Sequence, residues 1–220
     1  MMFSHRGPSD ADNVPPDLLA WRTRTTAPEN EIPTAVAFSA VLTRNDDIAV
    51  ALVGLRAFSV GLQFDVMVRF RTVPPGRQSA DIYSLIGGHT IDEESAQRRL
   101  LLGLEYSDGR RVTNVGFRFP PPATDPDAPT LMATGGSGGE LTYDQSYWLH
   151  PLPPPGPLLV VCRWPAFDLP ESRITLDGDA IVQAAGRAIT LWPWTEPADQ
   201  RSAEPPPLPL PEDGWFAARP

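Results

Sequence analysis

Lysine is absent from this chain of 220 residues, so all eighteen of its basic side chains are arginines. Cysteine is nearly absent as well, because Cys162 is the only one. A lone cysteine excludes an internal disulfide. Cys162 ends the apolar run 158–162, where we expect a buried and inert thiol in a reducing compartment.

The chain also lacks a basic excess and a long apolar run. Its formal net charge is −9, which would repel a phosphate backbone and predicts no nucleic acid partner. The longest apolar stretch, 48–62, is interrupted by Arg56 and Ser59 and falls short of the roughly 20 residues of a membrane helix. No apolar region typical of a secretory signal follows Met1. We therefore expect no membrane association and a cytoplasmic location.

Long helices are excluded by the 27 prolines, while a hydrophobic content of 41% is too high for a wholly disordered chain. The distribution of prolines predicts an irregular arm over 1–32, one domain over 33–194 and a flexible proline-rich tail over 195–220. In the arm, Leu18, Leu19 and Trp21 could dock on the domain or bind a partner. The segment 205–211 contains a PxxP motif, and it acts either as a spacer or as a ligand for an aromatic groove on another protein.

Alternation of apolar and polar residues is clearest at 61–71, where it predicts a strand with one face on a core. The same pattern marks strands at 36–42 and 48–52, joined by the turn 45–47. Asp108-Gly109 predicts a two-residue turn between strands 100–107 and 110–119. Further apolar segments bounded by prolines predict strands at 146–152, 158–164 and 173–176.

One helix is expected from Gly178 to about Ala188, with Asp177 as its N-cap. Thr90 and Glu93 could cap a second short helix, although the preceding Gly87-Gly88 makes a loop as good an interpretation. Hairpin connections without alternating βαβ units indicate the all-β class. The sequence thus predicts a two-layer antiparallel β-sandwich, jelly-roll-like, with one short helix and proline-rich termini.

Two segments, Glu105 to Asn114 and Tyr147 to Pro157 with its continuation Cys162-Arg163-Trp164-Pro165, resemble a family of uncharacterised proteins from GC-rich actinobacteria. The absence of lysine agrees with such a genome. The resemblance covers most of the predicted domain, and it implies no activity, cofactor or catalytic residue.

The segment 135–139 matches G-x-S-x-G, the nucleophile motif of α/β-hydrolases, and His150 follows Ser137 in the required order. That motif needs a strand before it and a helix after it, whereas Glu140 to Tyr143 is not helical in pattern. We therefore interpret 135–139 as a flexible glycine loop.

Metal and carboxylate sites have little support in the pattern. His5, His89 and His150 are isolated, and the acidic group 92–94 beside His89 fits a solvated loop better than a cation site. Asp65 and Glu105 lie on the predicted solvent faces of strands, and a glycosidase would need such a pair to converge. We assign no metal ligand, cofactor or catalytic residue.

Aromatic residues gather in the last third of the domain. Core packing is the simpler explanation for most of them, while an exposed row would form a platform for a sugar or peptide. The candidates for such a binding surface are Trp148, Trp192 and Trp194.

These patterns favour a soluble, non-enzymatic β-sandwich that acts as a binding or assembly component. Its partner would be another protein or a second copy of the chain, as in a self-assembling shell. The alternative is a hydrolase or sugar-active enzyme with a site near Ser137 and His150.

Overall fold

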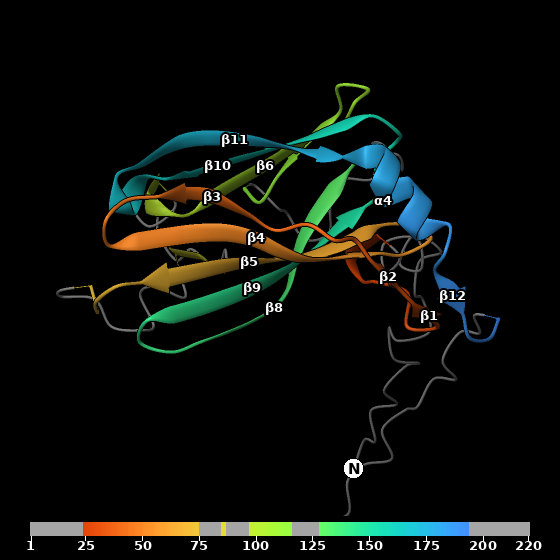
Figure 1. The fold of residues 1–220 in the computed structure, drawn as a ribbon, viewed down its shortest axis with the longest axis horizontal. Helices are drawn as coiled ribbons and strands as arrows, with labels where there is room; N and C mark the ends of the chain where they lie inside the picture. Colours follow the sequence, from red (N-terminus) through yellow and green to blue (C-terminus); the bar gives the residue numbers. More distant parts are fainter. Residues whose placement is uncertain (1–23, 75–84, 87–96, 116–127, 194–220) are drawn as a thin grey trace, which may run out of the picture.

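The structure, a computed structural model, describes residues 24–74, 85–86, 97–115 and 128–193. Residues 1–23 of the predicted arm, the tail, the capping box at Thr90 and the last four residues of the return strand 110–119 lie outside these ranges. Within the described end of the arm, Glu31 and Ile32 form a short strand, so this part is not irregular as predicted. Within the described ranges the chain forms an antiparallel β-sandwich with one α-helix, which confirms the predicted fold class (Figure 1).

The larger layer is a sheet in the order β2-β4-β5-β9-β8, with β3 also paired to β4. Its strands are β2 Thr34–Ala35, β3 Ala40–Arg44, β4 Ile48–Ala57, β5 Leu62–Phe70, β8 Thr130–Gly138 and β9 Thr142–His150. Of the predicted strand 36–42 only the last three residues are found in a strand, β3, because 36–39 connect β2 to β3 without strand pairing. The hairpin around 45–47 is confirmed. Asn45 fixes that turn, since its side chain accepts hydrogen bonds from the backbone N–H groups of Asp47 and Ile48 at 3.0 and 2.9 Å.

The smaller layer is a sheet in the order β11-β10-β6-β7. Its strands are β6 Leu101–Glu105, β7 Arg111–Thr113, β10 Pro157–Trp164 and β11 Leu169–Asp177, with a 3-10 turn, η2, at Pro165–Phe167. The chain crosses between the layers after β5, β7 and β9. At one side β3 lies beside β11, and at the other β7 lies near β8.

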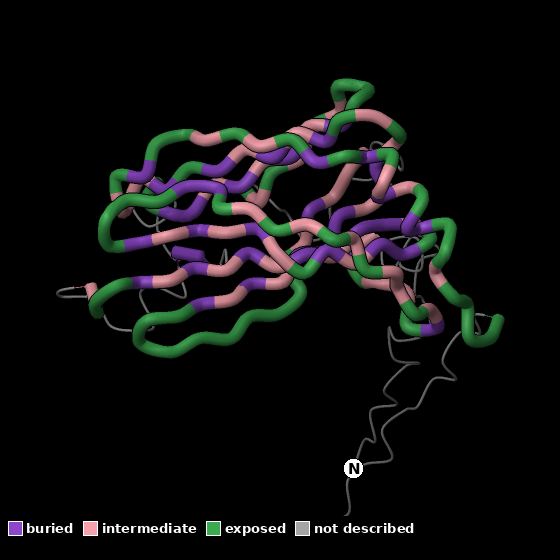
Figure 2. Tube along the Cα trace, viewed as in Figure 1, coloured by how far each residue is buried: buried purple, intermediate pink, exposed green. Residues whose placement is uncertain are grey.

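The core lies between the two sheets. Along β5 the inward residues Leu62, Phe64, Val66, Val68 and Phe70 are all buried, as the alternation predicts (Figure 2). From the smaller sheet, the same core contains Leu102, Leu104, Leu158, Val160 and Trp164. Burial of these side chains is the main source of stability for a sandwich without disulfides.

Helix α4, Gly178–Ala185, closes one end of the sandwich, where it packs against β2, β4 and β10. Ile181, Ala184 and Ala185 are its buried face, and the Asp177 side chain accepts a hydrogen bond from the Ala180 backbone N–H, which confirms the predicted N-cap. Of the helices in the described ranges, none has the length and apolar character to cross a membrane.

The predicted two-residue turn at Asp108-Gly109 is wrong in length. Backbone hydrogen bonds from Tyr106 N–H to the Arg110 carbonyl, and from Gly109 N–H to the Tyr106 carbonyl, both 2.9 Å, close a three-residue loop. Gly109 has a φ of 85°. A hairpin loop of three residues uses this left-handed conformation at its last position, where glycine avoids a steric cost.

The interpretation of 135–139 as a flexible loop is also wrong. Gly135 to Gly138 form the second half of β8 and pair in register with β9, where Gly138 faces Tyr143 and Ser137 faces Asp144. Glycine weakens a strand, but the hydrogen bonds to β9 and the contacts of that strand outweigh its low propensity.

Candidate binding surface

A two-stranded ribbon stands apart from the two main sheets, where the described part of the domain begins and ends. Its strands are β1, Glu31–Ile32, and β12, Ile189–Thr190. They pair antiparallel, so that Ile32 faces Ile189 directly. Figure 1 shows this ribbon projecting beyond α4, away from the core.

Polar contacts hold the ribbon in place. The buried Asn30 makes two of them. Its backbone carbonyl accepts a hydrogen bond from the Leu191 N–H at 2.8 Å, and its side-chain amide donates one to the Trp192 carbonyl at 2.9 Å. At the next residue, on β1 itself, the Glu31 carboxylate accepts a hydrogen bond from the Ser59 backbone N–H at 3.0 Å and another from the Ser59 hydroxyl. These bonds tie both strands to fixed positions, so the side chains beyond them are presented on a defined backbone.

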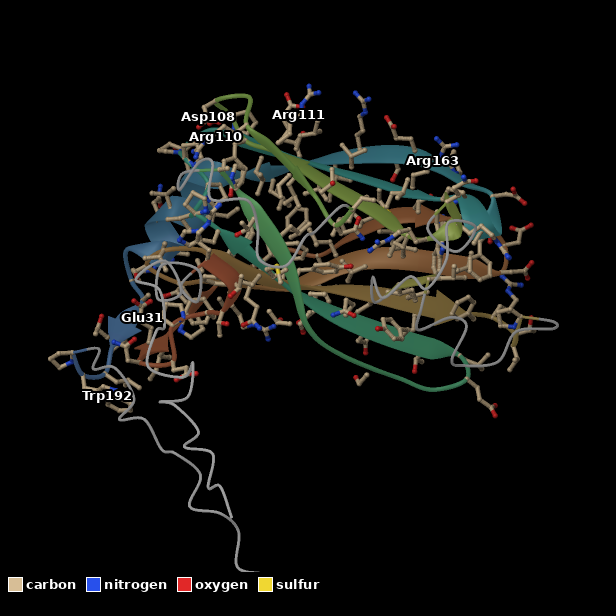
Figure 3. The ribbon with its side chains drawn as sticks, turned by 180° about the vertical axis from the view of Figure 1, so that it is seen from behind. Glu31, Asp108, Arg110, Arg111, Arg163 and Trp192 are labelled. Atoms are coloured by element: carbon tan, nitrogen blue, oxygen red, sulfur yellow. The ribbon has the colours of Figure 1, made fainter. Side chains whose placement is uncertain are left out.

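Apolar side chains on this ribbon are exposed to solvent. Trp192 is 57% exposed, and Ile189, Ile32 and Leu191 are 59%, 48% and 44% exposed. They are half of the eight large hydrophobic side chains that are exposed within the described ranges. We call these four residues the ribbon cluster. In Figure 3, Trp192 lies at the tip of the ribbon, with Glu31 on the neighbouring strand.

Trp192 was among the predicted surface residues and is exposed, while its part in binding stays a prediction. Ile32, Ile189 and Leu191 were not predicted. The segment 189–192, with three apolar residues beside the end of the domain, was a usable signal. The pairing of Ile32 with it depends on a contact between residues more than 150 positions apart.

The prediction that Trp148 belongs to a binding surface is wrong, because its side chain is 0% exposed. It lies on the outer face of β9, yet the ring of Phe58 packs edge-on against it, with centroids 5.4 Å apart and an interplanar angle of 84°. Gly61 allows this packing, since a Cβ atom there would lie 2.5 Å from two atoms of the indole ring. Trp148 is a structural residue.

The other aromatic residues in the last third of the domain are mostly part of the core. Tyr143, Tyr147 and Trp164 are buried, which confirms the interpretation of core packing for them. Tyr147 stacks on Phe64, with ring centroids 5.7 Å apart. Trp194 lies outside the described residues, so its assignment to the surface stays a prediction.

The structure does not bring Ser137 and His150 together. In the β8–β9 pair Ser137 faces Asp144 while His150 faces Thr130. Six residues of β9 therefore separate the two positions, a distance of about 20 Å at roughly 3.3 Å per strand residue. A nucleophile and its base must approach within hydrogen-bond distance, so these two residues do not form such a pair.

His150 is instead held near Arg24 at the start of β8. The Thr130 hydroxyl donates to the Arg24 carbonyl at 2.8 Å, and the Arg24 guanidinium donates to the Ala128 carbonyl at 2.8 Å. Burial, assisted by the charge of Arg24, lowers the pKa of His150 to about 4. The imidazole is therefore neutral at physiological pH.

Carboxylates and metal ligands do not converge within the described ranges. Asp65 pairs with Arg56 at 3.0 Å on the larger sheet, and Glu105 pairs with Arg111 at 2.8 Å on the smaller one. Each carboxylate thus has its own arginine, and the two lie in different layers. In these ranges His, Cys, Asp and Glu side chains also form no group of three that could hold a metal ion. His5, His89 and the acidic residues 92–94 are outside them.

Cys162 is buried in the interior with its thiol free, as predicted. Burial raises its pKa to about 12, so the thiol stays protonated at physiological pH. A protonated thiol is a weak nucleophile and a poor metal ligand. Cys162 therefore packs as a small apolar residue.

The outer face of the smaller sheet is strongly charged. Arg111 and Arg163 project from it in Figure 3. Glu105 forms an ion pair with Arg111, and Glu171 forms one with Arg173. Such alternating charges are typical of a solvated face. The ribbon cluster thus holds half of the large hydrophobic side chains that are exposed in the described part of the chain. Comparison of the chain with protein-family models, curated proteins and solved structures finds no match.

Proposed function

We propose that this protein is a non-enzymatic binding component, and that it engages a protein partner through the ribbon cluster. The observation that carries the proposal is the exposure of Trp192 beside Ile32, Ile189 and Leu191 on a backbone fixed by Asn30 and Glu31. Clustered apolar groups on a surface mark interaction sites, and tryptophan is enriched among the residues that dominate binding energy.

Burial of the exposed part of Trp192 by a partner would supply enough free energy for an anchor of specific binding. A tryptophan buries on the order of 200 Å² in a protein interior, so the exposed part of Trp192 offers about 100 Å² to a partner. At about 25 cal/mol per Å² this area is worth roughly 2.5 kcal/mol, which is enough for an anchor residue. The isoleucines and the leucine beside it enlarge the apolar area around that anchor.

A cytoplasmic location belongs to the same proposal. It is supported by the free thiol of Cys162, which agrees with a reducing compartment. The partner is either another protein or a second copy of this chain.

Replacement of Trp192 with alanine tests the proposal. The full chain is affinity-purified from its native cells as the wild type, as Trp192→Ala and as Val41→Ala, and the recovered proteins are quantified by mass spectrometry. Val41 is a matched control, since it is 52% exposed on β3, outside the ribbon. Sedimentation velocity of the three proteins measures self-association.

We expect one complex, with a partner or with a second copy, that Trp192→Ala weakens at least tenfold and Val41→Ala leaves unchanged. The Tm of Trp192→Ala should remain within about 2 °C of wild type, because an exposed side chain contributes little to folding. Identical complexes for the wild type and Trp192→Ala would contradict the proposal.

A further inference from the structure

The free edge of β8 is a second surface that the ribbon does not explain. Among the residues that the structure describes, β8 ends the larger sheet and pairs with β9 alone. β7 lies near β8 but pairs with β6. From Ala133 to Gly138 every residue is exposed, and Figure 2 shows this run along the lower edge of the sheet.

The exposed surface of this edge is largely main chain, because Gly135, Gly136 and Gly138 have no side chain to cover it. Gly139 donates its backbone N–H to the Thr142 carbonyl at 2.8 Å, which sets the alternation of the ladder. In an antiparallel pair every second residue bonds to the neighbouring strand. Ser137 therefore faces β9 with its main-chain groups, while Gly136 and Gly138 direct theirs to the open side.

Apart from one bulge-type irregularity, the described part of the chain gives β8 none of the usual protections of an edge strand. Proteins guard such edges with lysine or other charges, with proline, or by keeping the strand short. β8 has nine residues, none of them charged and none a proline, and its one irregularity is a register shift between Ala133 and Gly135. The other end of the same sheet is different, since β3 lies against β11 there.

The glycines also indicate which strand would fit. Near Gly135 a Cβ atom would meet no heavy atom within 4 Å, so the space above this position is open. Large side chains on a neighbouring strand can fill the space above edge glycines. A second copy of β8 would place its own small residues there and leave the space empty. A segment with large side chains at alternate positions fills it.

We propose that the β8 edge binds an extended peptide segment, which adds a strand beside Gly136 and Gly138 and carries large apolar side chains at alternate positions. Main-chain hydrogen bonds to the outward groups of these glycines would supply affinity, as in other cases of strand addition. The proposal is independent of the ribbon cluster, because β8 and the ribbon lie in separate sheets.

The test uses the full chain labelled with ¹⁵N and a capped nine-residue peptide of alternating threonine and phenylalanine. Amide exchange and chemical shifts are followed by NMR as the peptide is added. We expect saturable shifts at Gly136 and Gly138, with a Kd below about 1 mM and exchange at these two amides slowed at least tenfold. If hydrogen exchange at both amides stays unchanged at the highest peptide concentration that dissolves, the proposal is overturned.

Two controls separate strand addition from unspecific apolar contact. The same peptide carrying N-methyl groups on alternate amides cannot form the ladder, and we expect no binding from it. A Gly135→Lys variant adds an edge guard where space exists and should weaken binding at least fivefold, while Thr175→Lys on the exposed surface of β11 should not. Equal binding by the N-methylated peptide, or by Gly135→Lys, would also overturn the proposal. Loss of the ribbon complex with Trp192→Ala would leave these results unaffected.

Discussion

At the scale of single residues, the packing on the outer face of β9 depends on a glycine. Trp148 is buried there because the chain at Gly61 approaches the indole ring more closely than any side chain would permit. Periodicity along β9 alone places Trp148 on the outer face, and the sequence does not reveal that Phe58 and Gly61 cover it.

Gly61→Ala should therefore destabilise the protein strongly. Its Cβ atom would lie 2.5 Å from the Trp148 ring and 2.6 Å from the Leu149 carbonyl, so buried groups must move. We expect a loss of about 2 to 3 kcal/mol in the free energy of unfolding, measured by urea denaturation. Gly135→Ala is the control, because its Cβ atom would meet open space. It should leave stability unchanged or slightly raised, and equal losses for both variants would contradict this account of Trp148.

His150 should make stability depend on pH. Its pKa is lowered to about 4 in the folded protein, against about 6.5 in the unfolded chain. Below pH 6.5 the unfolded state therefore binds a proton that the folded state does not, so stability is complete above that pH and is lost progressively down to about pH 4.

The pH effect can be isolated by comparison with His150→Gln. Between pH 7.5 and 4.5 the wild type should lose on the order of 2 kcal/mol more than the variant, after allowance for the partial exposure of the ring. Urea unfolding at several pH values measures both curves. Parallel curves over this range would show that His150 is not shielded in the way described.

At the scale of secondary structure elements, α4 depends on its N-cap. Asp177 accepts a hydrogen bond from the Ala180 N–H at 3.1 Å, and its charge lies at the positive end of the helix. The eight residues of α4 are too few to form a stable helix alone, so the cap and the buried face of Ile181 and Ala184 act together.

Asp177→Ala should cost about 1 kcal/mol in the free energy of unfolding, since it leaves a helix N–H without this partner. Asp177→Asn retains the side-chain oxygen and should keep most of that stability. Circular dichroism with urea titration compares the two variants. An equal loss for both would assign the effect to the charge rather than to the cap.

The elements also show how far the sequence predicts this fold. β5 and the start of α4 were predicted correctly, because alternation and capping are local patterns, whereas α4 ends at Ala185 and not at about Ala188. β8 was missed because its glycines carry no apolar signal, and the strand is defined by pairing with β9. The ribbon was missed for a related reason, since β1 and β12 are two residues long and meet only in the folded chain.

The same reasoning applies to the candidate surface. The place of Trp192 at the end of the domain is as compatible with sealing the sandwich as with exposure, and the structure shows it exposed, whereas Trp148 is buried. Whether segments distant in sequence pack over a tryptophan decides whether it is exposed or buried. Local sequence does not contain that information.

At the scale of the whole molecule, the sandwich has a packed interior and two candidate binding surfaces, the ribbon cluster and the β8 edge. The core holds the sheets together, and the charged outer face of the smaller sheet remains solvated. The ribbon cluster offers apolar side chains, while the β8 edge offers main-chain groups. These differences in chemistry lead us to expect different partners at the two surfaces.

The most direct measurement for the proposed function is photo-crosslinking from the ribbon in native cells. A photoreactive amino acid replaces Ile189 in one version of the full chain and Thr175, on the far sheet, in another. We predict that position 189 crosslinks to one protein or to a second copy of the chain, that Trp192→Ala abolishes this product, and that position 175 does not form it. Crosslinking at position 189 no greater than at position 175, or a product that persists in Trp192→Ala, would contradict the role of the ribbon cluster.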